Sequence, residues 1–448
     1  MTRETAGAPP AERPLDRRDL KTLALASLGG ALEFYDFIIF VYFTATIGQL
    51  FFPPDTPDWL RQLQAFGLFA AGYLARPLGG VVMAHFGDRG GRKRMFTLSV
   101  FLMAVPTLLI GLLPTYAVVG YAAPLALLAL RVLQGAAVGG EVPGAWVFVA
   151  EHVPARRVGF ACGTLTAGLT LGILLGSLVA TAVTKAYAPH DVLAFAWRIP
   201  FLLGGVFGFF AVFLRRWLAE TPVFEVLRAR RGLVRGLPLR EVLRGHGRAV
   251  ALSMLLTWVL TAAIVVVILM TPTLLQKLYS FAPARALEAN SLATLALALG
   301  CVAFGALADR MGAARALRLG CAALLVAVYA LYLGLGAAPQ RLFALYAAAG
   351  FCVGVVGVVP VVMVRAFPAA VRFSGVAFAY NVAYAVFGGL TPLAVALMIA
   401  RVPLAPAHYV AALCVLGLAI ARHLAAAERA HRDAGAAVKR FEPRGERV

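Results

Sequence analysis

Long apolar stretches recur along the whole of this 448-residue chain, and they constrain its fold more than any other feature. A helix needs roughly 20 apolar residues to cross a bilayer core of about 30 Å. The chain is 61% hydrophobic and only 14% charged, and its mean hydropathy is +0.84. Because this composition lies far from that of soluble domains, it predicts an all-α integral membrane protein.

The stretches predict twelve transmembrane helices in two bundles of six, at residues 22–48, 60–87, 92–112, 118–151, 158–186, 197–217, 248–278, 287–308, 316–336, 341–366, 372–400 and 405–425. A long polar segment separates the two groups. The expected parts are a cytoplasmic N-terminal tail (1–21), an N-terminal bundle (22–217), a central cytoplasmic loop (218–247), a C-terminal bundle (248–425) and a cytoplasmic C-terminal tail (426–448).

The basic residues predict the orientation in the membrane. The first 21 residues hold no apolar core or cleavage site, so we expect no secretory signal peptide. If both termini are cytoplasmic, most of the 41 Lys and Arg fall in cytoplasmic segments, as the positive-inside rule requires. The net charge of +20 comes without a recognition helix, so we expect contact with anionic membrane lipid and no nucleic acid partner.

The two halves repeat each other. GDRGGRKR (87–94) follows the second span and ADRMGAAR (308–315) follows the eighth, while EHVPARRVG (151–159) and AFPAAVRFSG (366–375) follow the fourth and tenth. An acid, a flexible turn and a basic cluster at a cytoplasmic helix end suit a latch between helices. The expected latch and gate residues are Asp88, Arg89, Gly91, Arg92, Glu141, Glu151, Arg157, Asp309, Arg310 and Arg372.

This repetition, with the motifs LEFYDF (32–37), RPLGG (76–80), GDRGGRK (87–93), RVLQGAAVGGE (131–141), WRIPFLLG (197–204), AETPVFE (219–225) and VRFSGVAFAYN to FGGLTP (371–392), resembles the metabolite:proton symporters of the major facilitator superfamily. The resemblance implies the major facilitator fold, with two bundles that rock about a central site. It also implies import of small organic acids or zwitterions, such as citrate, alpha-ketoglutarate, shikimate, proline or betaine, with protons. Ala84, Ala313 and Ala314 depart from the family pattern, and the last two predict a weaker second latch.

Two acids inside the first span, Glu33 and Asp36, are costly in hydrocarbon and indicate a use for at least one. Asp36, Arg76 and Arg131 fall about 20, 17 and 26 Å from the cytoplasmic ends of their helices, close to the midplane. We predict that Asp36 carries the proton and that Arg131 sets its pKa, because burial and a guanidinium act on a carboxyl in opposite directions. Glu33 is either an intracellular relay or a structural partner of a helix end.

Arg76 and Arg131 present donors in fixed forks that suit a carboxylate, although Arg76 has an alternative role in helix packing. The C-terminal half offers only polar and aromatic groups. The further residues expected to bind substrate are Tyr35, Trp258, Tyr380, Asn381 and Tyr384, and the tyrosines have packing as their alternative. Pro272, Pro360 and Pro392 are candidate kinks at gating points.

The sequence contains no P-loop, HExxH or GxSxG motif, so we expect no enzyme and no cofactor. The five cysteines fall in expected spans without metal-ligand spacing, and no metal site is predicted. The expected function is proton-coupled import of a carboxylate or zwitterion by a monomer in a bacterial inner membrane. The alternatives are an exporter of the same fold and, more distantly, a membrane sensor that transports nothing.

Overall fold

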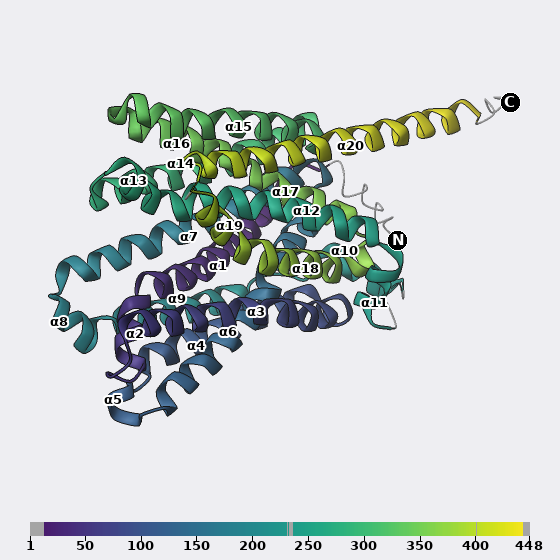
Figure 1. Ribbon diagram of the computed structural model, residues 1–448. Coiled ribbons are helices and arrows are strands. Elements are labelled where there is room, and N and C mark those ends of the chain that lie inside the picture. Colours follow the sequence, from purple (N-terminus) through teal and green to yellow (C-terminus); the bar gives the residue numbers. More distant parts are fainter. Residues whose placement is uncertain (1–12, 231, 233–235, 400, 442–448) are drawn as a thin grey trace.

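The computed structural model describes residues 13–230, 232, 236–399 and 401–441, and this part of the chain is helical throughout (Figure 1). The helices of the N-terminal half are α1 (Arg17–Tyr42), α2 (Thr44–Phe51), α3 (Asp58–Gly90), α4 (Arg92–Leu112), α5 (Tyr116–Val119), α6 (Ala122–His152), η1 (Ala155–Arg157), α7 (Val158–Ala186), α8 (Pro189–Asp191), η2 (Val192–Ala196) and α9 (Arg198–Arg215). Two short helices, α10 (Pro222–Ala229) and α11 (Pro238–Gly245), lie in the segment between the halves.

The C-terminal half contains α12 (Gly247–Ile264), η3 (Val265–Met270), α13 (Thr271–Tyr279), α14 (Pro283–Met311), α15 (Ala313–Ala337), η4 (Pro339–Arg341), α16 (Leu342–Val353), η5 (Gly354–Val358), α17 (Val359–Ala366), η6 (Ala369–Val371), α18 (Arg372–Ala383), η7 (Tyr384–Gly388), α19 (Gly389–Ile399) and α20 (Ala405–Phe441). Helices therefore cover all twelve expected segments where they are described, apart from turn residues, and the expected span 22–48 is divided between α1 and α2 at Phe43. The expected single spans 248–278, 341–366 and 372–400 are each built from two α-helices joined by a short π- or 3₁₀-helical segment.

Eleven helices in the described residues are long and apolar enough to cross a membrane. The second expected span is α3, which lies outside those eleven. It is 33 residues long, or about 50 Å, and its second half carries Arg76, His85, Asp88 and Arg89. Because α3 packs against α6 within the bundle, it still occupies the position of the second span.

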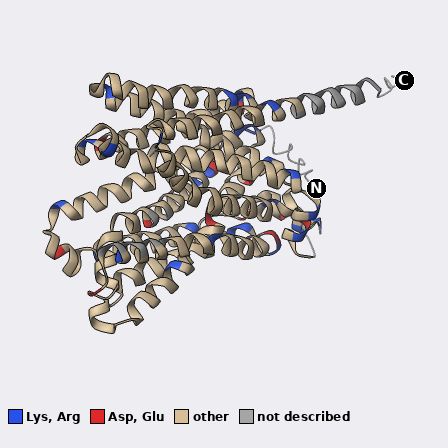
Figure 2. Ribbon diagram, viewed as in Figure 1, with Lys and Arg blue, Asp and Glu red and all other residues tan. Residues whose placement is uncertain are grey.

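The two halves lie side by side, with α1 to α9 in the lower part of Figure 1 and α12 to α20 in the upper part. The helices α10 and α11 and the projecting end of α20 lie at one end of the molecule. Figure 2 shows Lys and Arg gathered around that end. We call it the basic end.

Close helix crossings hold both the bundle and the halves together. In the N-terminal half, a Cβ on Gly135 of α6 would overlap the carbonyl oxygen of Gly72 in α3, so these two backbones touch. Between the halves, Gly159 of α7 and Gly305 of α14 are in the same relation. Small residues let membrane helices approach this closely, and van der Waals contact then stabilises the pair.

The sequence repeat is visible in the backbone. Gly91 joins α3 to α4 with φ 117°, and Gly312 joins α14 to α15 with φ 92°. Residues with a side chain rarely adopt these angles, which explains a glycine at both positions. Each glycine directs the chain from one long helix into the next at the basic end.

The two halves differ in the continuity of their helices. Pro77, Pro106 and Pro143 lie inside unbroken α-helices of the N-terminal half. In the C-terminal half, the π-helical segment η3 precedes Pro272, and the 3₁₀ segment η5 precedes Pro360. The π-helical segment η7 precedes α19, which contains Pro392. The three candidate kinks therefore coincide with breaks in α-helical hydrogen bonding.

Candidate functional site

A small cavity, here called the central cavity, lies between the halves. Its lining residues are Phe34, Asp36, Gly72, Tyr73, Arg76, Met103, Arg131, Gln134, Gly135, Val138 and Tyr384. Helices α1, α3, α4 and α6 supply the residues of the N-terminal half, and the C-terminal half contributes Tyr384. Sequence reasoning had expected Asp36, Arg76, Arg131 and Tyr384 at one site, and the structure brings these four together.

Asp36 and Arg131 are linked by a chain of hydrogen bonds. The Thr107 hydroxyl donates to Oδ2 of Asp36, and Nε2 of Gln134 donates to the Thr107 hydroxyl at 2.7 Å. Nη1 of Arg131 donates to Oε1 of Gln134 at 2.8 Å. Asp36 and Arg131 are buried, with 7% and 6% of their surfaces exposed. The acid and the guanidinium therefore communicate through two neutral polar side chains.

The second carboxylate oxygen of Asp36 has a different environment. Oδ1 is buried and has no hydrogen-bond partner among the described residues. A buried polar atom without a partner is costly, so such an atom indicates a group that is absent from the structure or a functional role. Asp36 lines the central cavity, and its Oδ1 lies beside Gly204 of α9, where this oxygen is available for a proton.

Arg76 lies among aromatic rings. Its guanidinium carbon is 5.0 Å from the ring centroid of Tyr73 and 4.9 Å from that of Tyr384. The two tyrosine rings are stacked, with centroids 5.8 Å apart and planes 15° from parallel. Tyr73 and Arg76 belong to α3, whereas Tyr384 begins η7 in the other half. This cation–π cluster therefore closes the cavity between the halves.

The cavity is too small for a metabolite as it stands. Its volume is about 40 Å³, whereas a single water occupies at least about 10–15 Å³ on the same measure. The space therefore holds only a few waters. Any larger ligand requires movement of lining side chains or of the two halves.

The structure places the other expected binding residues outside the lining of this cavity. The Tyr35 hydroxyl donates to the carbonyl oxygen of Pro200 at 2.9 Å, and its ring packs edge-on against Phe207 of α9. A tyrosine whose hydroxyl is satisfied within one bundle is a packing residue, and the i−1 neighbour of Asp36 faces a different side of α1. The side chain of Glu33 lies outside the described part of the chain.

Trp258, Tyr380 and Asn381 each have protein partners instead of facing the cavity. Trp258 stacks on Phe387 with ring centroids 4.3 Å apart, and its Nε1 donates to Tyr409 at 3.1 Å. Tyr380 packs edge-on against Trp146 of α6 at 5.0 Å. Nδ2 of Asn381 donates to the carbonyl oxygen of Gly139 at 2.7 Å. Tyr380 and Asn381 therefore join the halves rather than line this cavity.

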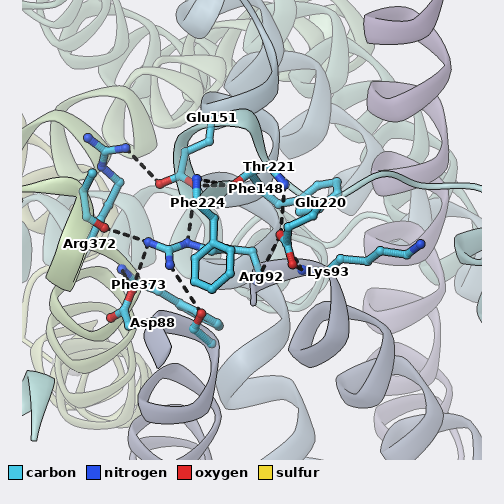
Figure 3. Close-up of polar contacts among 12 residues, drawn as sticks. Asp88, Arg92, Lys93, Phe148, Glu151, Glu220, Thr221, Phe224, Arg372 and Phe373 are labelled. Carbon is cyan, nitrogen blue, oxygen red and sulfur yellow. Dashed lines mark hydrogen bonds and ion pairs between the residues drawn. The ribbon is translucent and has the colours of Figure 1, made fainter. Parts of the chain in front are cut away.

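At the basic end, a group of charged residues ties the halves together (Figure 3). We call Asp88, Arg92, Glu151 and Arg372 the first clasp. Asp88 at the end of α3 accepts from the backbone amides of Phe373 at 3.4 Å and Ser374 at 2.9 Å, in the first turn of α18. A carboxylate is stabilised at a helix N-terminus by free amides and by the helix dipole.

Arg92 and Glu151 complete the first clasp. Arg92 pairs with Asp88 at 3.1 Å and with Glu151 at 3.4 Å, and its Nη2 donates to the Ala369 carbonyl at 2.7 Å. Glu151 also accepts from Arg372 of α18 at 3.0 Å. Because Ala369 and Arg372 belong to the C-terminal half, Arg92 and Glu151 both make contacts across the interface.

Asp309 with the amides of Gly159 and Phe160 forms the second clasp. Asp309 at the end of α14 accepts from these amides at 2.6 and 2.7 Å, in the first turn of α7. The position that matches Arg92 is Ala313, so no ion pair equivalent to Arg92–Asp88 forms there. Arg89, Arg157 and Arg310 are exposed at the same end.

Glu141, expected at the latch, lies instead inside the N-terminal half. It forms an ion pair with Arg215 of α9, and Ser99 of α4 donates to it. Both partners of the ion pair have side chains only 1% exposed. Glu141 therefore fixes α4, α6 and α9 within one bundle, because its partners all belong to that bundle.

Sequence reasoning missed four residues with direct roles in this geometry. Gln134 lies three residues after Arg131, and this helical spacing places both on one face. The spacing could therefore have predicted a contact between them. Thr107 and Tyr73 carry no local pattern that separates them from packing residues. Glu220 accepts from the amides of Arg92 and Lys93 at 3.1 Å, and it belongs to the motif AETPVFE, which by itself predicts no contact with α4.

Among the described residues, no group of three or more His, Cys, Asp and Glu side chains could hold a metal ion.

Comparisons with known proteins agree on one family. Residues 27–392 match the family described as "Major Facilitator Superfamily". A "Putative proline/betaine transporter" of Staphylococcus aureus (strain COL) is 32% identical over 419 residues, which cover 89% of this chain and 87% of that protein. The "Glycine betaine/proline/ectoine/pipecolic acid transporter OusA" of Dickeya dadantii is 30% identical over 419 residues, covering 90% and 82%.

Solved structures give the same fold. The proton:xylose symporter XylE, bound to 6-bromo-6-deoxy-D-glucose, matches with a TM-score of 0.73 over 90% of this chain and 94% of its own. The identity between the two is 16%, so this likeness concerns the fold alone.

Proposed function

Because this chain belongs to the major facilitator superfamily, we propose that it imports a small zwitterionic osmolyte of the proline or betaine type together with protons. The chain is a multi-pass membrane transporter, not an enzyme. The substrate class, the proton coupling, the direction and the residues below are the proposal. Its relatives' names support the substrate class, and the central cavity supports it on chemical grounds.

The composition of the central cavity carries the proposal. A zwitterion needs an anion site and a cation site a few ångströms apart. Arg76 and Arg131 supply forked donors for a carboxylate, while the rings of Tyr73 and Tyr384 attract an ammonium group. A substrate with two or three carboxylates would place one of them against the negative faces of these rings, so this cavity favours a molecule with one carboxylate.

Arg76 gives the site a means of responding to substrate. In the present structure its guanidinium contacts Tyr73 and Tyr384, where a substrate's alkylated ammonium group would bind. A carboxylate drawing Arg76 towards itself would free the two rings. Binding would then alter a contact between the halves, because Tyr384 belongs to the C-terminal half.

Asp36 is the proposed proton carrier. Asp36 lines the cavity, its Oδ1 has no partner among the described residues, and its Oδ2 is joined to Arg131 through Thr107 and Gln134. A guanidinium stays protonated under ordinary conditions, so Arg131 stabilises the ionised acid and Asp36 binds the proton. Substrate at Arg131 would weaken that stabilisation, which couples the two ligands.

The two clasps are the proposed gate on the basic end, which we place in the cytoplasm of a bacterial cell on the positive-inside rule. In this orientation both termini are cytoplasmic and the present structure is closed on the inside. Release of substrate requires the first turns of α7 and α18 to part from Asp309 and Asp88. One chain contains the whole pathway, and we propose that it works as a monomer.

The test is uptake into proteoliposomes with an imposed inward proton gradient. Glycine betaine, proline and ectoine are offered beside citrate and shikimate, while substrate uptake and external pH are followed. We expect accumulation of at least one zwitterion, external alkalinisation, and no uptake of citrate. Citrate uptake alone would overturn the substrate class. Movement only out of the vesicles would instead identify an exporter.

A further inference from the structure

A second hollow lies on the outside of the N-terminal half, away from the central cavity. Its lining residues are Lys93, Arg94, Thr97, Leu98 and Phe101 of α4, Val212 of α9, and Glu220 of the segment before α10. Its volume is about 580 Å³. We call it the α4–α9 groove. It begins at the basic end and runs along the face that the bundle presents to the membrane.

The chemistry of the groove changes along its length. Lys93 is half-buried and Arg94 is exposed at the first turn of α4. Leu98 and Phe101 follow on the same helix and are 39% and 42% exposed, so their surfaces face the bilayer. From Lys93 to Phe101 the helix rises about 12 Å. We therefore expect Lys93 and Arg94 at the depth of the lipid headgroups. The apolar side chains of Leu98 and Phe101 then lie deeper, in the hydrocarbon region.

The acid in the groove offsets only part of this positive charge, because Glu220 carries one negative charge beside the two cations Lys93 and Arg94. The carboxylate of Glu220 already accepts from the amides of Arg92, Lys93 and Thr221 at 3.1, 3.1 and 2.9 Å. It is therefore held against the N-terminus of α4. In Figure 3 the Lys93 side chain extends away from Arg92 and the first clasp. Its ammonium group contacts only the Arg216 carbonyl among the described residues, at a long 3.4 Å.

Two further observations point to a ligand with a polar head. Oγ1 of Thr97 is buried in the groove lining and has no hydrogen-bond partner among the described residues. Beside the groove, Arg216 lies 3.7 Å from the ring centroid of Phe213 and Lys21 lies 5.3 Å from that of Trp217. Aromatic rings with cations are typical of the depth at which lipid headgroups lie.

We propose that the α4–α9 groove binds one anionic phospholipid. Its phosphate and glycerol head contact Lys93 and Arg94, with Thr97 donating from below. One acyl chain lies along Leu98, Phe101 and Val212. The charge complementarity selects an anionic head over a zwitterionic one, and the apolar wall selects a lipid over a soluble phosphate.

The test is native mass spectrometry of the full chain released from detergent micelles that contain phosphatidylglycerol or phosphatidylcholine. The variant is Lys93→Gln with Arg94→Gln. The matched control is Arg315→Gln with Arg318→Gln, which removes two exposed charges from α15, the counterpart of α4 in the other half. Arg94→Gln alone is a second variant, because Arg94 is exposed and takes no part in the clasps.

We expect the wild-type chain and the control to retain one phosphatidylglycerol about tenfold more than phosphatidylcholine, because each basic residue near a lipid head favours an anionic one. The double variant should lose this preference, and Arg94→Gln should lose part of it. Equal retention of the two lipids by the wild-type chain would overturn the proposal, as would an unchanged preference in the double variant. Competition by sn-glycerol 3-phosphate would show that the groove binds a soluble phosphate and not a lipid.

Discussion

Asp88 and Asp309 occupy matching positions at the ends of α3 and α14, and each binds the first turn of a helix in the opposite half. Asp88 accepts from the amide of Ser374 at 2.9 Å, and Asp309 accepts from the amide of Gly159 at 2.6 Å. The two halves therefore hold each other reciprocally through these two matching carboxylates. Only Asp88 is also paired with a guanidinium, that of Arg92.

We expect Asp88→Asn to open the basic end more often, because a hydrogen bond to a charged acceptor contributes about 1.5–3 kcal/mol. Cys162 is fully buried in α7 next to the second clasp and serves as a native reporter. Its alkylation by a soluble maleimide, measured by peptide mass spectrometry, should rise about tenfold or more, as such a free energy implies. Asp191→Asn, which changes a half-buried acid of α8, is the control. An unchanged rate in Asp88→Asn would contradict the role of the clasp.

We expect Asp36→Asn to abolish accumulation of substrate against its gradient while leaving exchange of substrate across the membrane. An amide keeps the size and the hydrogen bond from Thr107 but cannot carry a proton. Uptake and counterflow in the same proteoliposomes separate these two activities. Asp55→Asn, an exposed acid after α2, should behave as wild type. Accumulation by Asp36→Asn would exclude Asp36 as the proton carrier.

We expect Gly135→Ala to lower the stability of the N-terminal half. The new methyl group would overlap the carbonyl oxygen of Gly72, so α3 and α6 must separate, and overpacking of this kind costs about 1–3 kcal/mol. A fluorescence melt in detergent should show a lower Tm. Gly67→Ala in the same α3 meets no atom within 4 Å and is the matched control. Equal Tm values for the two variants would refute tight contact at Gly135.

We expect the single variants Glu141→Gln and Arg215→Met to destabilise the fold strongly, because each leaves a buried charge without its partner, at a cost of about 3–5 kcal/mol. The double variant removes both charges and should recover part of that loss. A double-mutant cycle of Tm and denaturant unfolding measures the coupling. Strictly additive losses would show that the pair does not act as a unit.

The sequence predicted the helical segments, and among the residues expected at the latch it included the side chains of the two clasps, although Glu141 lies elsewhere. The length of an apolar stretch determines where a chain can cross a bilayer. The two DR-x-G turns show directly that the halves repeat each other. Asp36, Arg76 and Arg131 were identifiable because charges in an apolar stretch are rare and need an explanation. They belong to three different helices, so only the structure shows that they line one cavity.

The aromatic and polar residues were harder to assign. Tyr35 is adjacent to Asp36 but faces Pro200, and Tyr380 is one turn from Tyr384 but packs on Trp146. Which side of a fully buried helix faces a cavity depends on packing with other helices, and a helix that is apolar all round carries no such signal. Glu141 was misplaced for the same reason, because its partner Arg215 is distant in sequence.

The π-helical segment η7 makes Tyr384 an adjustable contact. Tyr384 is the first residue of that segment, at the junction with α18, whose opposite end is held by Asp88. A π-helical segment contains one residue more than the α-helix needs, and moving that surplus by one position turns the intervening residue by about 100° about the helix axis. Such a shift would move the side chain of Tyr384 away from Arg76. The first turn of α18, which Asp88 binds, would stay in place. In the proposed transport cycle, the unbroken helices of the N-terminal half would hold the charged residues of the cavity in place, while a shift in η7 would change the contact of Tyr384 with Arg76.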